Sequence, residues 1–405
     1  MSLDPTVLAS LRADADAQLP QIAELRHALH RVPEIGLRLP KTQALVLDAL
    51  APLGLEITTG KDLDSVVAVL RGGKPGPAVL LRGDMDALPV TEDTGEPFTS
   101  EHVGVMHACG HDMHVAGLVA AARLLAARRE DLAGDVVFMF QPGEEGDGGA
   151  EIMIREGVLD AAGSRVVAGY GLHVRSATLP LGKIAARPGP LLAATAPFRA
   201  HVHGVGGHGS TPWHAADPVP VAAEIVLALQ SMVTRTFDVF DPVVVTVGMI
   251  KAGTANNIIG NDALIDATVR TLSAEHRKAA EDRIHRLVNG IAAAHGMTAT
   301  VEWLPGYPVT VNHAPEVARL AALATAMYDE ECYVEEPEPV LGAEDFSYVL
   351  EQVPGAFFWV GATPPELDPA TAPYNHSTGA RFHDDALAAG PAVLAALAMD
   401  RLSES

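Results

Sequence analysis

Short apolar runs that end in polar residues recur along the first half of the chain. Residues 79–86 read Val-Leu-Leu-Arg-Gly-Asp-Met-Asp, residues 136–145 read Val-Val-Phe-Met-Phe-Gln-Pro-Gly-Glu-Glu, and residues 166–173 read Val-Val-Ala-Gly-Tyr-Gly-Leu-His. Apolar runs of this length are typical of buried strands. A helical pattern such as Val115–Arg129 separates successive runs. The alternation predicts an α/β fold whose site lies at the carboxyl ends of its strands.

A second pattern occupies the middle of the chain, between proline- and glycine-rich breaks at 187–190 and 305–308. It predicts a β-α-β-β-α-β order, which is the ferredoxin-like plan. The helical pattern of 315–329, the strand of 356–360 and the helix of 384–402 then return the chain to the first domain. We therefore predict a discontinuous metal-binding catalytic domain, 1–188 and 306–405, that is interrupted by an inserted domain, 189–305. The predicted elements of the insertion are strands 198–203, 243–250, 263–271 and 298–303, and helices 219–234 and 274–295.

Composition narrows the classes of function. The 28 basic and 51 acidic residues give a formal net charge of −23, which would repel nucleic acid and anionic membranes. The first thirty residues lack the apolar core of a targeting signal, and no run of about eighteen apolar residues follows. We expect a soluble cytoplasmic protein. With two cysteines, a disulfide framework is not expected, and Cys109 is more useful as a ligand.

The densest chemistry lies in residues 106–114, Met-His-Ala-Cys-Gly-His-Asp-Met-His. Thiolate, imidazole and carboxylate are the side chains that bind zinc or manganese. Cys109 and His111 can converge on one ion if the segment is extended rather than helical; the alternative is a buried thiol beside a helix-capping histidine. We assign His107 and His114 supporting roles, because a ligating imidazole needs a partner for its second nitrogen.

Two adjacent carboxylates, Glu144 and Glu145, follow a predicted strand through Pro142 and Gly143. Neighbouring side chains on a loop point in different directions, so one carboxylate can bind metal while the other moves protons. The alternative is a solvated acidic turn.

Histidines and aspartates elsewhere extend this set. His173, after an apolar run, and His376 complete a possible group of five ligands. Asp86 could orient a ligating imidazole, whereas Asp84 could satisfy backbone donors.

The inserted domain presents a glycine-rich loop, residues 204–212, that carries His208. It lacks the lysine of a phosphate-binding loop, so we do not assign that function. The amide of Asn257 suits an oxyanion and the guanidinium of Arg270 suits a carboxylate. A surface ion pair is the alternative for Arg270.

Together these motifs resemble the M20 metallopeptidase family, in particular its branch of hippurate hydrolases, indole-3-acetyl-amino-acid hydrolases and N-acyl-amino-acid amidohydrolases. The likeness covers essentially the whole chain. Two departures, Thr378 without the proline often found there and Met113 where a small residue is common, leave the substrate preference open. The matching stretches are residues 25–34, 82–89, 107–112, 141–145, 206–209 and 342–346.

The resemblance implies a Zn-peptidase-like α/β catalytic domain with a central sheet and an inserted ferredoxin-like α+β dimerisation, or lid, domain. It implies two divalent ions per subunit, zinc, manganese, cobalt or nickel. It also implies a homodimer joined through the insertion, in which His208 polarises the scissile carbonyl of the other subunit, Asn257 lies near the oxyanion and Arg270 holds the substrate carboxylate. The implied metal ligands are Cys109, His111, Glu145, His173 and His376, and the implied catalytic group is Glu144 as general base with Asp86 and His208.

These observations predict a metal-dependent amidohydrolase that cleaves N-acyl amino acids into a carboxylic acid and a free amino acid. An aminopeptidase, dipeptidase or carboxypeptidase with the same centre is the alternative within enzymes. A metal-binding or receptor protein without turnover is the alternative outside them, and the presence of Glu144 beside Glu145 argues against it.

Overall fold

The computed structural model describes residues 3–404. The chain groups into two compact units. Unit 1 holds the residues up to Leu191, Val311–Glu338, and the residues from Asp345 onward; unit 2 holds Leu192–Thr310 and Pro339–Glu344. The sequence had placed the junctions at 188 and 305, and the short segment Pro339–Glu344 is an addition to the middle unit.

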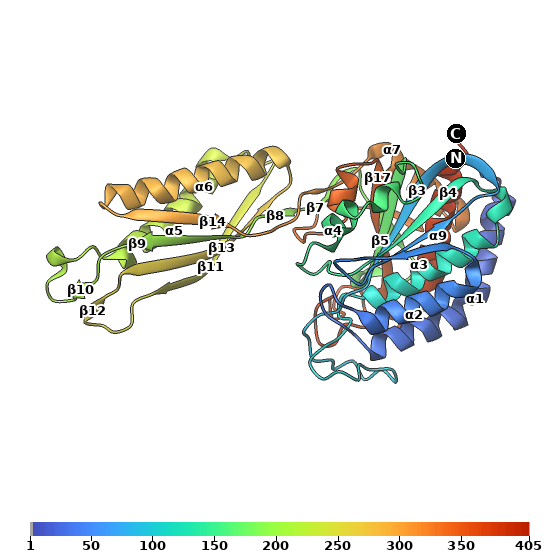
Figure 1. Cartoon of the computed structure of the whole chain (residues 1–405), viewed down its shortest axis with the longest axis horizontal. Helices are drawn as coiled ribbons and strands as arrows, with labels where there is room; N and C mark the ends of the chain where they lie inside the picture. The colour runs from blue at the N-terminus through green and yellow to red at the C-terminus, as the bar shows by residue number, and fades with distance from the viewer. Residues whose placement is uncertain (1–2, 405) are drawn as a thin grey trace. The chain divides into compact units, whose positions relative to one another are not determined.

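Unit 1 is built on one mixed eight-stranded sheet (Figure 1). Its four central strands, β4, β3, β5 and β17, run parallel, and β2 and β6 flank them antiparallel. Asp84 pairs in register with Gln141, so β3 and β4 end side by side and bring their following loops to one edge. The strand order is β1 (Glu56–Thr59), β2 (Val66–Leu70), β4 (Ala133–Gln141), β3 (Lys74–Asp84), β5 (Ala168–Pro180), β17 (Gly355–Thr363), β6 (Ile184–Ala186) and β16 (Tyr333–Glu335).

Two apolar helices, α3 (His111–Ala126) and α9 (Ala386–Leu402), pack against the sheet and against each other. Both helices are buried along almost their whole length. They are rich in alanine, whose small side chain lets neighbouring backbones approach closely. Helix α1 (Pro5–Arg31) packs over them and begins where the Asp4 carboxylate accepts the Thr6 N–H at 2.8 Å. The remaining helices of this unit are α2 (Pro40–Leu50), η1 (Ala51–Leu53), η2 (Arg129–Asp131), α4 (Gly149–Arg155), η3 (Val158–Asp160), α7 (Ala314–Met327) and α8 (Ser347–Leu350).

Unit 2 has its own antiparallel sheet, in the order β11-β13-β9-β14 with β8 added beside β13. Helices α5 and α6 pack together and against this sheet, and Phe198, Ile225 and Ile284 are fully buried in the core between them. Strands β7 and β15 pair where the chain enters and leaves the unit. The elements are β7 (Gly189–Leu192), β8 (Ala194–Thr195), β9 (Phe198–His203), β10 (Gly207–His208), η4 (Pro212–His214), α5 (Pro218–Thr236), β11 (Val243–Ala252), β12 (Ile258–Ile259), β13 (Asp262–Thr271), α6 (Ala274–Ala294), β14 (Thr298–Trp303) and β15 (Thr310–Asn312).

The β-α-β-β-α-β order predicted for the insertion matches β9, α5, β11, β13, α6 and β14 within a few residues. One strand of unit 1 differs from the prediction, because β5 begins at Ala168 and extends to Pro180, which places His173 inside the strand rather than after it. The helices α1 and α2 and the strands β1 and β2 had no counterpart in the prediction. Among the helices of residues 3–404, none has the length and apolar character to cross a bilayer.

Candidate metal centre

The segment that carries Cys109 and His111 turns sharply at the amino end of α3. Gly110 has a φ of 91°, and a Cβ on it would lie 2.5 Å from Val174 Cγ2, so both the turn and the packing require glycine. His111 is the first residue of α3, not part of an extended segment as the sequence had suggested. The left-handed backbone conformation of Gly110 still brings the side chains of Cys109 and His111 close together, and His173 on β5 lies beside them.

All five predicted ligands come together in unit 1. Cys109 Sγ lies 3.2 Å from His173 Nε2 and 3.1 Å from His376 Nε2, and His376 Nε2 lies 3.2 Å from Glu145 Oε1. Cys109 thus belongs both to a group with His111 and His173 and to a group with Glu145 and His376, each with ligand atoms within 4.8 Å of one another. His111, Glu144 and Glu145 form a third such group.

The imidazole hydrogen bonds leave lone pairs facing this cluster. His173 Nδ1 donates to the Val174 carbonyl at 2.8 Å, which leaves its Nε2 as an acceptor facing Cys109. His111 is fully buried, yet neither ring nitrogen hydrogen-bonds within the described chain. Its nearest carboxylate oxygens, on Asp84 and Asp86, are both 3.5 Å away. Buried imidazoles normally find partners, so these orphaned nitrogens fit a bound cation.

The pKa shifts of Cys109 and His111 also favour a bound cation. Burial, followed by the charges of Glu145, Glu144 and Asp84, raises the pKa of the Cys109 thiol well above its ordinary value. Burial alone would lower the pKa of His111, but Asp84 and Asp86 outweigh it and raise that pKa to about 10. The cluster therefore carries excess negative potential, and divalent cations offset such potential and deprotonate a coordinating thiol.

Asp86 holds the Glu144–Glu145 loop and lies beside the His111 imidazole. Its two carboxylate oxygens accept the backbone N–H groups of Glu144 and Glu145, each at 3.0 Å. The 3.5 Å separation between Asp86 Oδ1 and His111 Nδ1 is long for a hydrogen bond. Glu144 is 6% exposed, so the loop is not the solvated turn considered from the sequence.

His114 belongs to the support of the site. Its Nδ1 donates to Asp84 at 2.5 Å and its Nε2 accepts the Val174 N–H at 2.9 Å, so both ring nitrogens are occupied. Asp84 also accepts from Arg82 at 2.6 Å, so the expectation that Asp84 satisfies backbone donors is wrong. His107 is buried with no hydrogen-bond partner for its ring among residues 3–404, and burial lowers its pKa to about 3.

Asn375 organises the site, and the sequence analysis did not assign it a role. Its amide nitrogen donates to the carbonyls of Cys109 and Val174 at 2.9 and 3.0 Å, and its oxygen accepts the Ser176 N–H at 3.0 Å. One side chain thus ties together the segments that carry Cys109, His173 and His376. The only signal for this role in the sequence was its position beside His376. In the structure His376 has a positive φ of 71°.

A buried network of Arg82, Gln141 and Asp345 lies at the ends of β3 and β4. The Gln141 amide donates to both oxygens of Asp345 at 2.8 Å, and the Ala150 N–H at the start of α4 donates to Asp345 at 2.9 Å. Arg82 donates to Gln141 at 2.9 Å and to Asp345 at 3.1 Å. This network holds α4 against the loop of Glu144.

Of the three candidates in unit 2, His208 and Arg270 lie on strands and Asn257 lies in the turn before β12. His208 is exposed on β10 and its Nδ1 accepts the Ser210 N–H at 3.1 Å, which leaves Nε2–H as a donor. The Asn257 carbonyl accepts the Gly209 N–H at 2.9 Å, so Asn257 lies beside the His208 loop. Arg270 on β13 is half-buried, its pKa is lowered by burial, and within residues 3–404 it makes no ion pair.

Residues 80–400 match peptidase family M20/M25/M40. The chain is 39% identical over 387 residues to thermostable carboxypeptidase 1 of Saccharolobus solfataricus, covering 93% of this chain and 94% of that protein. It is 36% identical over 389 residues to IAA-amino acid hydrolase ILR1-like 2 of Arabidopsis thaliana, covering 95% and 85% of the two chains.

A solved structure of similar sequence is that of the Bacillus subtilis YXEP protein, described as a dinuclear metal binding peptidase from the M20 family. It superposes with a TM-score of 0.82 at 32% identity, covering 96% of this chain and 99% of that one. This match confirms the predicted α/β sheet domain with a separate small antiparallel domain. The predicted family is confirmed as well: the chain belongs to peptidase family M20/M25/M40 and is a metal-dependent hydrolase.

Proposed function

We propose that this hydrolase cleaves the amide bond of N-acyl amino acids, releasing a carboxylic acid and a free amino acid. The position of Glu144 is the main support for the proposal. Its side chain is buried, Asp86 accepts its backbone N–H, and one of its carboxylate oxygens lies within 4.8 Å of ligand atoms of His111 and Glu145. A carboxylate so placed is suited to proton transfer, while the donors around it are suited to metal. The similarity to an amino acid conjugate hydrolase supports this substrate class.

In this proposal Cys109, His111, Glu145, His173 and His376 hold two divalent ions, zinc, manganese, cobalt or nickel. Mixed sulfur, nitrogen and oxygen donors accept all four metals. When bound, the ions polarise the scissile carbonyl and lower the pKa of the attacking water. The orphaned nitrogens of His111 and the His173 Nε2, whose lone pair faces Cys109, support the assignment.

The protein's own groups perform the proton transfers. Glu144 takes a proton from the attacking water and gives it to the leaving nitrogen, so the amino acid departs as a neutral amine. Asp86 positions the loop that carries Glu144 through two backbone hydrogen bonds. Because Glu144 transfers the protons, the carboxylate of Glu145, the next residue, is available to bind metal.

Unit 2 carries the other three residues that we propose to act on the substrate. The Nε2–H of His208 can donate to the developing oxyanion, and Asn257, whose backbone carbonyl binds the Gly209 N–H of the same loop, is proposed to lie near that oxyanion. Arg270, which lacks an ion-pair partner among the described residues, suits the carboxylate of the amino acid. We propose that 189–305 acts as a dimerisation and lid domain and that His208 serves the partner subunit.

Replacing the proposed base tests the chemistry. Glu144→Gln should lower kcat by about 10²–10⁴-fold on N-acetyl, N-benzoyl or indole-3-acetyl amino acids, with metal content and Tm unchanged. Glu151→Gln, on the exposed face of the neighbouring helix, is the matched control and should leave kcat unchanged. A Glu144→Gln protein with normal turnover would show that another group moves the proton.

Carboxypeptidase activity is the second candidate, favoured by the 39% identity to thermostable carboxypeptidase 1. Both activities need an amide whose nitrogen belongs to a residue with a free carboxylate. Comparing kcat/KM for acetylated amino acids, N-blocked dipeptides and free dipeptides separates them. Preference for N-blocked dipeptides over acetylated amino acids would favour the carboxypeptidase.

The homodimer is supported by the edge of the unit 2 sheet. Strand β11 pairs on one side only, and Met249 and Ile250 on it are 44% and 50% exposed. Open apolar edges are typical of pairing surfaces.

Mixing His208→Ala with Glu144→Gln protein should restore part of the activity after subunit exchange, because each mixed dimer then has one intact site. Exchange without recovery would contradict a shared site.

A further inference from the structure

The loop that carries Glu144, residues 142–148, is rich in glycine. Gly143, Gly146 and Gly148 all have positive φ, at 75°, 110° and 68°. Glycine restricts the backbone less than any other residue, so the side chains of the loop do little to fix its shape. The position of the Glu144 carboxylate therefore depends on the groups to which the loop is hydrogen-bonded.

Asp86 holds the middle of this loop, and the carboxylate of Asp345 joins its two ends. At the amino end of the loop, the Gln141 amide nitrogen donates to both Asp345 oxygens at 2.8 Å. At the carboxyl end, the Ala150 N–H donates to the same carboxylate at 2.9 Å. Asp345 and Gln141 are fully buried, and hydrogen bonds away from water are electrostatically stronger.

The Asp345 carboxylate is ionised at neutral pH. Burial raises the pKa of Asp345 to about 6, although the guanidinium of Arg82, 3.1 Å away, opposes that rise. An ionised carboxylate is a strong hydrogen-bond acceptor, so its bonds to both ends of the loop are charge-assisted. One oxygen of Asp345 also lies within 4.8 Å of one oxygen of Glu144. Asp345 is therefore next to the proposed base and bonded to the segment that carries it.

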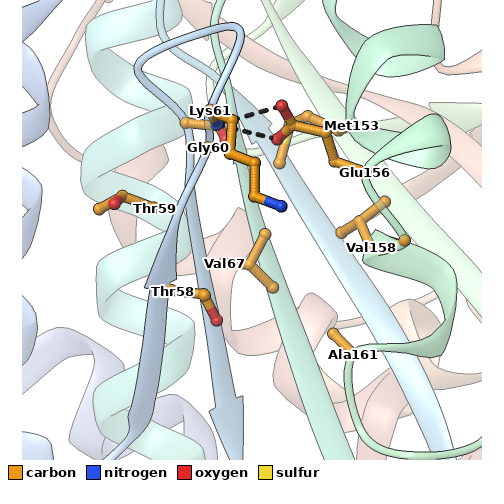
Figure 2. Close-up of a pocket in the computed structure, with 11 residues that line it drawn as sticks. Thr58, Thr59, Gly60, Lys61, Val67, Met153, Glu156, Val158 and Ala161 are labelled. Carbon is orange, nitrogen blue, oxygen red and sulfur yellow. Dashed lines mark hydrogen bonds between the residues drawn. The ribbon is translucent and has the colours of Figure 1, made fainter.

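Helix α4, which follows the loop, is held at its other end as well. Glu156, the residue after α4, accepts the backbone N–H of Lys61 at 3.1 and 3.3 Å and that of Asp62 at 2.9 Å. Figure 2 shows the bonds to Lys61. Helix α4 also packs against α8 and β4. Because α4 is anchored at its far end, the bond from Ala150 to Asp345 ties the loop to a fixed element.

The two carboxylates of the loop differ in what else can hold them. Glu145 belongs to a ligand group with Cys109 and His376, so a bound metal would hold its side chain. Glu144 has to take up and release a proton, so its position depends more on the loop. We propose that Asp345 is a positioning residue, which fixes both ends of the loop and so keeps the Glu144 carboxylate in place for proton transfer. This inference rests on the proposed role of Glu144.

Asp345→Asn tests the proposal in the full-length, metal-loaded enzyme. Its new amide group would face the Gln141 amide as donor against donor, and kcat should fall about 10²-fold, the cost of misplacing a catalytic group by about 1 Å. KM and metal content should stay at the wild-type values, because the loss concerns the transition state. Asp400→Asn is the matched control. Asp400 is also fully buried beside an arginine, Arg319, but outside the ligand groups, so kcat should not change.

A double-mutant cycle separates positioning from a purely structural role. If Asp345 acts through Glu144, Asp345→Asn should lower kcat about 10²-fold in the wild-type background and hardly at all in Glu144→Gln, where the base is already gone. Equal losses in the two backgrounds would overturn the proposal. Gln141→Met removes one donor to Asp345 but keeps its charge, and kcat should fall here too. An unchanged kcat in Gln141→Met would assign the effect to the Asp345 charge and would also overturn the proposal.

Hydrogen exchange gives a readout that does not depend on turnover. The backbone N–H groups of residues 142–150 should exchange faster in Asp345→Asn than in wild type or Asp400→Asn, because the loop opens more often. Unchanged exchange would mean that Asp345 does not fix the loop. A wild-type enzyme inactive on N-acyl amino acids would contradict the proposed substrate class alone, and the kcat comparison would then use a peptide substrate.

Discussion

Two clusters of buried histidines and carboxylates meet at the start of α3, where His111 belongs to one and Asp112 to the other. In the Asp112 cluster, Arg26 and His30 donate to the same carboxylate at 2.8 and 2.9 Å, and His30 reaches Glu92 at 3.2 Å. In the His111 cluster, both nitrogens of the buried imidazole lack hydrogen bonds within residues 3–404, whereas in the Asp112 cluster both His30 nitrogens are bonded and only the second oxygen of Asp112 lacks a partner.

The difference separates a structural ion network from a candidate metal centre. Composition alone does not distinguish them, since each contains histidine and acidic residues. Positive charge is supplied in the Asp112 cluster by the guanidinium of Arg26, whereas no lysine or arginine lies among the five candidate ligands. Metal should therefore matter for one cluster and protonation for the other.

The largest expected effect comes from breaking the metal cluster. His111→Ala should lose bound metal and with it measurable hydrolysis, because His111 belongs to ligand groups on both sides of the site. Elemental analysis of the purified protein and a turnover assay check this. His30→Gln, the matched change in the other cluster, should keep its metal, and loss of metal in both variants would mean that the clusters work as one.

Breaking the ion network should act on stability instead. Asp112→Asn removes the fully buried carboxylate that Arg26 and His30 share and leaves Arg26 only the partly exposed Asp384, so the free energy of unfolding should fall by about 3–5 kcal/mol. Denaturation of the metal-loaded protein measures the change. Metal content should stay at the wild-type level, so an Asp112→Asn protein that unfolds normally but binds no metal would contradict the separation.

The smallest expected effect is a pH dependence. Burial lowers the pKa of His30, but Asp112 and Glu92 outweigh it and raise that pKa to about 9 from 6.5. A raised pKa in the folded state contributes stability that is fully present below pH 6.5 and is lost as the pH rises towards 9. The free energy of unfolding should fall across that window, and His30→Gln should fall less. Equal slopes would remove His30 as the cause.

Local sequence was informative where an element carries its own pattern. The alternation of strands and helices in the insertion identified β9, α5, β11, β13, α6 and β14, because each element shows its period within a single window. It was less informative for α1, a long helix whose polar residues mask its apolar positions, and for β5, where Gly169 and Gly171 resemble a strand end.

The sequence by itself determined the donor types of the site. Cys109, His111, Glu145, His173 and His376 were identified from side-chain chemistry and from motif likeness, and the fold brings all five together. The same motifs also offered His114, Asp84 and Asp86, whose parts could not be separated along the chain. Side-chain chemistry sets which atoms can bind metal, and it is encoded residue by residue.

Only the tertiary structure decided how those donors are used. The two nitrogens of His114 are hydrogen-bonded to Asp84 and to the Val174 N–H, which favours a supporting role for His114, and the oxygens of Asp86 accept two backbone N–H groups of the Glu144 loop. Asn375 gains its role from carbonyls more than two hundred residues away in the chain. Hydrogen-bond partners depend on distances in space, and the folded backbone alone sets those distances.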